Sequence, residues 1–101
     1  MASRQPPKQW TLVTHEAYFH SLRQVVSDQD RYALVTAIWQ TLQKTNNPIE
    51  NAKPVPDRAG RFTIELEGYL VPFEVAVDAN GHLVKDATKI RLLPIIRADI
   101  S

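Results

Sequence analysis

Basic residues in the second half of the chain have the types and spacing of a phosphate-binding patch. Four of them fall on predicted strands and could share one end of a sheet: Arg61, Lys89, Arg91 and Arg97. Two more lie in the proline-rich segment that precedes those strands, namely Lys53 and Arg58. Guanidinium and ammonium groups bind phosphate and carboxylate oxygens through charge-assisted hydrogen bonds. The pattern therefore predicts a site for a phosphate or for an acidic partner.

The same cations have a simpler interpretation, because glutamates alternate along the same predicted strands. Glu65, Glu67 and Glu74 stand on the polar sides of these strands. Cross-strand pairs between such acids and the arginines would contribute from a few tenths to about 1 kcal/mol each. The basic residues would then be solvated residues of a sheet, and those before the strands would be loop surface. The sequence leaves both interpretations open.

Other kinds of chemistry find little support in the composition. The chain has no cysteine, which excludes disulfides, thiolate metal sites and thiol nucleophiles. Its three histidines, His15, His20 and His82, lack the spacing of a metal site, and His82 is expected to be exposed beside a turn. With three glycines, the chain has no glycine-rich phosphate loop. We therefore expect no metal and no cofactor.

Apolar residues on the polar side of the predicted sheet form a second candidate site. Ile95 and Ile96 must point to opposite faces of a strand, so one of them lies on the face away from the helices. The alternation assigns three residues to this face as a possible partner surface: Leu70, Leu93 and Ile95. Exposed apolar patches of roughly a few hundred Å² often mark binding sites. The alternative is that one end of the chain folds over the patch.

A β-α-α-β-β-β order positions these residues. Residues 10–14 predict a strand, 15–26 a helix and 27–45 a second helix, with Thr14 and Ser27 as caps. Phe19, Leu22 and Val26 form the apolar stripe of the first helix, joined by Tyr18 and Val25. Val35, Ile38 and Leu42 form that of the second, widened by Tyr32 and Trp39, which are expected in the core. The two helices should form an antiparallel hairpin.

Residues 46–60 predict a long loop, and strands follow it. Alternation predicts strands over 61–67, 69–77 and 89–96, with a turn at 78–81 that residues 82–84 extend as a hairpin. Pro72 cannot donate a ladder hydrogen bond, so it should lie at a bulge or an unpaired position. The class is α+β: an antiparallel-rich sheet with a helical hairpin packed on one face. Residues 1–8 predict a flexible N-terminal arm and residues 9–101 a single domain.

Five stretches of the sequence resemble the RelE/ParE superfamily of bacterial toxins from toxin–antitoxin pairs. They are WTLVTHEAYFHSL, LQKTNNP, AKPVPDRAGRF, GYLVPFEVAVDANG and IIRADI. The third is similar to the family's "AKPL…G…YR", the fourth to its "GdYRviYeV-d-" hairpin and the last to its terminal "GHRxdVY". The likeness covers residues 9–100. It implies the family's fold, a cytoplasmic protein and a cognate antitoxin that wraps it with a helix or a strand.

The resemblance also implies a target, but few catalytic residues match. RelE-type members cleave mRNA in the ribosome with basic residues, whereas ParE-type members inhibit DNA gyrase. The family's basic positions fall here on Thr63, Glu65 and Glu67, and its hairpin arginine on Leu70. The terminal motif keeps Arg97, which the resemblance makes a candidate catalytic residue. Its Gly-His pair is Ile95-Ile96, and the late aromatic acid or base would lie at or beyond Ser101.

Two hypotheses follow from this comparison of residues. The first is a toxin of this fold whose ribosome-dependent mRNA cleavage is weak or lost. The second is a non-catalytic protein-interaction module descended from the fold, for which a homodimer is one expected form. The net charge of +1 lacks the basic excess of a dedicated nucleic-acid binder. No apolar run is long enough to predict a membrane span.

Overall fold

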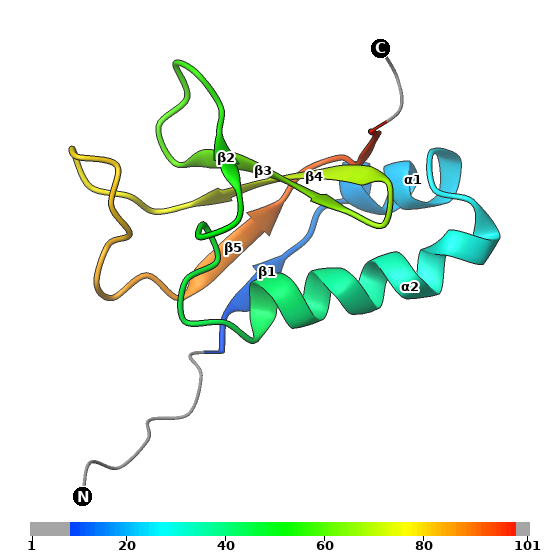
Figure 1. The fold of residues 1–101 in the computed structure, drawn as a ribbon, viewed down its shortest axis with the longest axis horizontal. Helices are drawn as coiled ribbons and strands as arrows, with labels where there is room; N and C mark the ends of the chain where they lie inside the picture. Colours follow the sequence, from blue (N-terminus) through cyan, green and yellow to red (C-terminus); the bar gives the residue numbers. More distant parts are fainter. Residues whose placement is uncertain (1–8, 99–101) are drawn as a thin grey trace, which may run out of the picture.

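The computed structural model describes residues 9–98, which form a twisted sheet with two helices beside it (Figure 1). Its six strands are β1 (Thr11–Val13), β2 (Lys53–Pro54), β3 (Arg61–Leu66), β4 (Tyr69–Val75), β5 (Lys89–Leu92) and β6 (Ile96–Arg97). Five of them lie side by side in the order β1-β5-β4-β3-β2, and β6 also pairs with β4. The pair β1–β5 is parallel, and the other pairs are antiparallel. The predicted α+β class is confirmed. The arm predicted over residues 1–8 lies outside the described residues.

Helix α1 (Glu16–Gln24) and helix α2 (Asp28–Ile38) follow each other almost directly. Ser27 caps α2 as predicted, since its hydroxyl accepts a hydrogen bond of 3.3 Å from the N–H of Asp30. The predicted cap at Thr14 is wrong, because α1 begins after His15, whose side chain makes no capping hydrogen bond. Buried residues of both helices join those of the strands in a single apolar core.

The end of α2 widens into a π-helical turn over Trp39–Gln43, where the N–H of Lys44 donates to the carbonyl of Trp39 at 3.2 Å. The wider turn keeps Leu42 in the core, in line with Leu34 and Ile38. The prediction that Tyr32 and Trp39 lie in the core is wrong, because both side chains are exposed. Leu34 and Ile38 form the buried face of the helix instead.

Two further side chains that the helical stripes placed in the core are exposed, namely Phe19 and Val35. In both helices the buried face is narrower than the apolar pattern suggested. On α1 it is formed by Tyr18 and Ser21, and on α2 Leu34 replaces Val35. Packing against one sheet face covers only part of a helix's circumference, which explains the difference.

The hairpin β3–β4 has the predicted alternation. Phe62, Ile64, Val71 and Phe73 are buried on the helix side. Its two-residue turn consists of Glu67 (φ 53°) and Gly68 (φ 83°), both left-handed as a type I′ turn requires. The segment 46–60, predicted as a loop throughout, contains the short strand β2, whose two residues pair with Thr63 and Phe62 of β3. A strand of two residues is too short to show periodicity.

The chain turns back after β4 at Asp78, where the sequence predicted the turn of a second hairpin. The carboxylate of Asp78 accepts backbone hydrogen bonds from His82 (3.0 Å) and Asn80 (2.9 Å), and these hold the pKa of Asp78 below its ordinary value. Val77 and Leu83 form an isolated bridge, so the hairpin extends past the turn by one pair. The His82 side chain is exposed, as expected.

A bulge interrupts the predicted strand over 89–96. β5 pairs Leu92 with Phe73, whereas β6 pairs Ile96 with Leu70, so three residues, 93–95, face only Val71 and Pro72. The N–H of Leu93 donates to the carbonyl of Pro72 at 3.0 Å, but proline has no N–H to return the bond. The ladder therefore breaks beside Pro72, as its lack of a donor predicted.

The bulge reverses the alternation over Ile95, Ile96 and Arg97 relative to an unbroken strand. Ile95 is 2% exposed and packs in the core, whereas Ile96 is 48% exposed. The predicted outward position of Ile95 is therefore wrong, and Ile96 takes that place opposite Leu70.

Candidate functional site on the outer face of the sheet

The outer face is the side of the sheet that points away from the helices, and a row of charged residues crosses it. Arg61 lies opposite Glu74 across β3–β4, and Glu74 lies opposite Arg91 across β4–β5. Nη2 and Nε of Arg61 donate to Oε2 of Glu74 at 2.8 and 3.2 Å. Nη1 of Arg91 lies 3.6 Å from Oε1 of the same carboxylate. One glutamate thus bridges two of the predicted phosphate-binding cations.

Lys89 and Lys53 lie on the same face at its two sides. Lys89 is two residues before Arg91 on β5 and lines a shallow hollow of about 360 Å³ with Arg91 and Glu74. Lys53 lies opposite Thr63 on β2. The outer face therefore gathers four of the predicted cations, with Glu74 at the centre of the charged row.

Arg58 belongs to the loop between β2 and β3 and shares a second hollow with Arg61. Gly60 brings this loop against β4: its φ is 84°, and a Cβ there would lie 2.7 Å from the carbonyl oxygen of Val75. The loop therefore holds Arg58 near the end of the charged row, without making it part of that row.

An apolar strip continues the outer face beyond the charged row. It consists of Leu70, Pro72, Leu93 and Ile96. Leu70 and Ile96 are directly opposite across β4–β6, and Leu93 is bonded through its backbone to Pro72. The structure thus places Leu70 and Leu93 where the sequence did. Pro72 and Ile96 complete the strip.

Arg97 lies on the other side of the sheet, because the bulge sets it opposite Tyr69, whose side chain is buried on the helix side. There it lines a hollow at the start of α2 together with Tyr69 and Asp30. The predicted grouping of Arg97 with Arg61 and Arg91 is therefore wrong. A single phosphate on the outer face would not contact all three.

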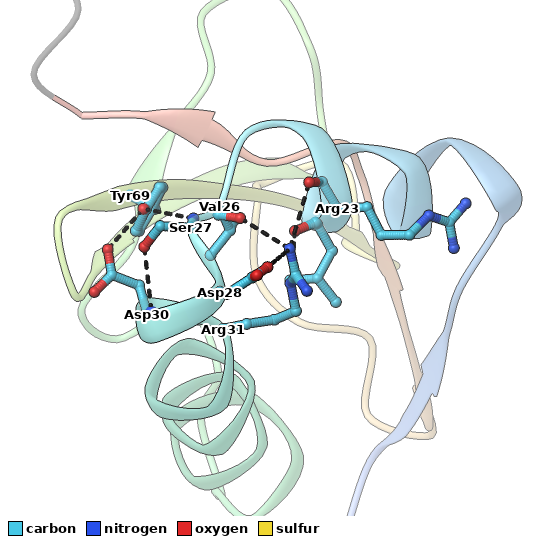
Figure 2. A network of polar contacts seen from close by, with 8 residues as sticks. Arg23, Val26, Ser27, Asp28, Asp30, Arg31 and Tyr69 are labelled. Atoms are coloured by element: carbon cyan, nitrogen blue, oxygen red, sulfur yellow. Dashed lines mark hydrogen bonds and ion pairs between the residues drawn. The ribbon is translucent and has the colours of Figure 1, made fainter.

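The hollow beside Arg97 contains a polar network that the sequence did not reveal (Figure 2). The hydroxyl of Tyr69 donates to Oδ2 of Asp30 at 2.8 Å and accepts from the N–H of Ser27 at 3.4 Å. Arg31 pairs with Asp28 at 2.9 Å, and its guanidinium also donates to carbonyls at the end of α1. These contacts fix the junction between the helices against β4. The part of this network that the sequence indicated was the Ser27 cap. The hydrogen bond from Ser27 to Tyr69 joins residues 42 positions apart, so no local pattern could predict it.

Two other kinds of site find no support in the part of the chain that the structure describes. Residues 9–98 contain no group of three or more His, Cys, Asp or Glu side chains that could hold a metal ion. Within the same residues no helix is long and apolar enough to cross a membrane.

Comparisons with known proteins place the fold. No family model matches the sequence. No curated protein matches it either. Among solved structures, a chain of the RelBE2 toxin–antitoxin complex from Mycobacterium tuberculosis matches with a TM-score of 0.66 and 19% identity. The match covers 97% of this chain and 100% of that one. The chain has a RelE-like toxin fold, and the low identity fits a divergent sequence.

Proposed function

We propose that this chain is the toxin-fold member of a cytoplasmic toxin–antitoxin pair, and that it acts by binding proteins through its outer face. Its capacity to cleave mRNA is weak or lost. The observation that carries this proposal is the bridging of Arg61 and Arg91 by Glu74.

A phosphodiester bond is cleaved where cations stabilise the charge that develops on the phosphate. On the outer face, a carboxylate already occupies the space between the two central guanidiniums. An incoming phosphate would have to replace these ion pairs and would meet the negative charge of Glu74. Arg97, the residue that best matches the family's motif, lies on the opposite face. The described geometry supports electrostatic recognition better than catalysis.

The outer face has the composition of a protein-binding surface. It combines an apolar strip with a charged row at its side, as in interfaces that have an apolar core and a polar rim. A cognate antitoxin is the partner we propose, since a solved chain of similar fold belongs to a toxin–antitoxin complex. An antitoxin segment with apolar side chains and acidic neighbours would suit the strip and the arginines.

Induced expression of the chain, with and without the small gene beside it, tests the proposal. We expect growth arrest that the neighbour's product relieves, and no mRNA cleavage in a translation extract. Arg91→Ala and Arg97→Ala should remain toxic. Ribosome-dependent cleavage that either substitution abolishes would overturn the proposed loss of catalysis. A gyrase supercoiling assay on the same protein would show whether the arrest follows the ParE-type mode.

Substitution of the apolar strip tests the partner surface. Ile96→Glu places a charge in the strip at a side chain that is already exposed, so it should weaken antitoxin binding by about tenfold or more while leaving the fold intact. Ala79→Glu, in the exposed turn after β4, is the matched control and should bind normally. Equal binding by both variants would remove the strip from the interface.

The apolar strip also favours a second candidate function, a non-catalytic interaction module without toxicity. Expression without growth arrest, combined with Ile96-dependent binding of the neighbouring product, would support this second function over the first. The two functions share the surface and differ in the cellular target.

A further inference from the structure

Three large apolar side chains lie exposed along one line of α2. Tyr32 is 83% exposed, Val35 41% and Trp39 40%. Their spacing of three and four residues places them on one stripe of the helix, here called the α2 stripe. The core residues Leu34 and Ile38 point in another direction, since successive residues are turned by about 100°. The α2 stripe shares no residue with the outer face.

The types of residue on this stripe indicate a protein partner. Tyr and Trp are enriched at protein interfaces and among the residues that carry most of the binding energy. The Trp39 ring is contacted by the ammonium group of Lys44, 4.2 Å from the ring centroid. This cation–π contact orients the ring without burying it.

We propose that α2 pairs antiparallel with α2 of a second copy of this chain. The stripe is self-complementary under a two-fold axis that passes between Val35 and Thr36. In that arrangement Tyr32 packs against Trp39 of the partner subunit, and Val35 lies beside the axis against its own copy. The pair of Tyr32 and Trp39 then occurs twice, once on each side of the two Val35 side chains.

The charges at the two ends of the stripe favour this antiparallel direction. Asp28 stands in the first turn of α2 and its side chain is 92% exposed, whereas Lys44 follows the last turn. The two-fold axis sets Asp28 opposite Gln43 of the partner subunit, within reach of the neighbouring lysine. Asp28 already pairs with Arg31 in its own chain and keeps a free side for a second cation. Antiparallel helix dipoles add to the same preference. A parallel pairing would bring the like charges together.

Sedimentation of the full chain over a range of micromolar concentrations tests the pairing. We expect a monomer–dimer equilibrium, and Tyr32→Arg should raise the dissociation constant about tenfold or more. Tyr32 is so exposed that its replacement should not disturb the fold. Gln40→Arg introduces the same charge on an exposed position of the same helix, off the stripe, and should leave the equilibrium unchanged.

Charge reversal tests the direction of the pairing. Asp28→Lys and Lys44→Asp should each weaken the dimer, and the double variant should restore most of the affinity. Circular dichroism of each variant controls for folding, because both residues also make contacts within their own chain.

Acrylamide quenching of tryptophan fluorescence gives an independent readout. Trp39 is exposed and Trp10 is buried, so quenching should fall as the concentration rises, and Trp39→Phe should remove this change. A monomer at every concentration would overturn the proposal. The same holds if Trp39 of that monomer is protected from acrylamide, because another part of its own chain would then cover the stripe. A dimer that Tyr32→Arg leaves intact would also overturn it, because such a dimer uses another face.

Discussion

The hydroxyl of Ser21, on α1, accepts a hydrogen bond of 2.8 Å from the backbone N–H of Ile95, inside the bulge. The same hydroxyl donates to the carbonyl of Tyr18 at 2.7 Å, and all three groups are buried. Ser21→Ala would leave the N–H of Ile95 without this acceptor. We expect the free energy of unfolding, measured in urea, to fall by about 1–3 kcal/mol.

His20→Ala is the control for that substitution, because His20 is the exposed neighbour on the same helix. It should change the free energy of unfolding by less than about 0.5 kcal/mol. Equal effects from the two variants would show that Ser21 does not anchor the bulge.

Removing the charge of Glu74 should expose the latent affinity of the outer face for polyanions. In Glu74→Gln, Arg61 and Arg91 lose the carboxylate that bridges them. We expect single-stranded RNA to bind several-fold more tightly at low salt, with a steeper salt dependence, because more counterions are released. Fluorescence anisotropy with a labelled oligonucleotide would measure both.

Glu50→Gln makes the same change of net charge at an exposed position outside the charged row and serves as the control. If it raises RNA affinity as much as Glu74→Gln does, the effect is one of overall charge and the bridging carboxylate is irrelevant.

Tyr69→Phe should loosen the junction between α2 and β4. The phenol loses its hydrogen bonds to Asp30 and to the N–H of Ser27, which are partly buried. The free energy of unfolding should fall by about 1 kcal/mol. A double-mutant cycle with Asp30→Ala isolates the Tyr69–Asp30 contact, and a coupling energy near zero would contradict its role.

Asp78 should make stability depend on pH in the acid range. Its pKa in the folded chain is lowered by backbone hydrogen bonds from His82 and Asn80, relative to the ordinary value of 3.8. A lowered pKa gives stability that is present above the unfolded pKa and is lost as the pH falls through the folded pKa. The loss should therefore begin as the pH drops below about 4.

Asp78→Asn should remove that part of the pH dependence, since an amide does not titrate. Asp57→Asn makes the same substitution in an exposed loop and is the control for this variant. NMR titration of the Asp78 carboxyl would show the lowered pKa directly. An ordinary pKa for Asp78 would contradict the expected dependence.

The sequence predicted the elements that depend on local patterns. Alternation located β3 and β4, and the Ser27 cap located the start of α2, because both signals lie within a few residues. The bulge was visible only as backbone donors missing at two prolines, Pro72 on β4 and Pro94 within the bulge. Where a ladder absorbs an extra residue depends on a neighbouring strand some 20 residues away, and the pattern of one strand does not contain that information.

The candidate site was predicted in part for the same reason. Arg61, Arg91 and Leu70 precede the bulge or lie on the unbroken hairpin, and the alternation placed them on the outer face. Ile95 lies in the bulge and Arg97 follows it, and both were assigned to the wrong face. The polar network around Tyr69 joins segments that are distant in sequence, so no local spacing could reveal it.

The bulge at 93–95 decides on which side of the sheet Arg97 lies. A strand of the same length that closed the bulge would slip by one residue, pairing Ile95 with Leu70 and Ile96 with Tyr69, and Arg97 would emerge on the outer face, on the side of Arg91. Ile95 and Ile96 are the same residue type, so the slipped strand would still bury an isoleucine. A slip of one residue, with no substitution at all, would thus carry a cation from one side of the sheet to the other.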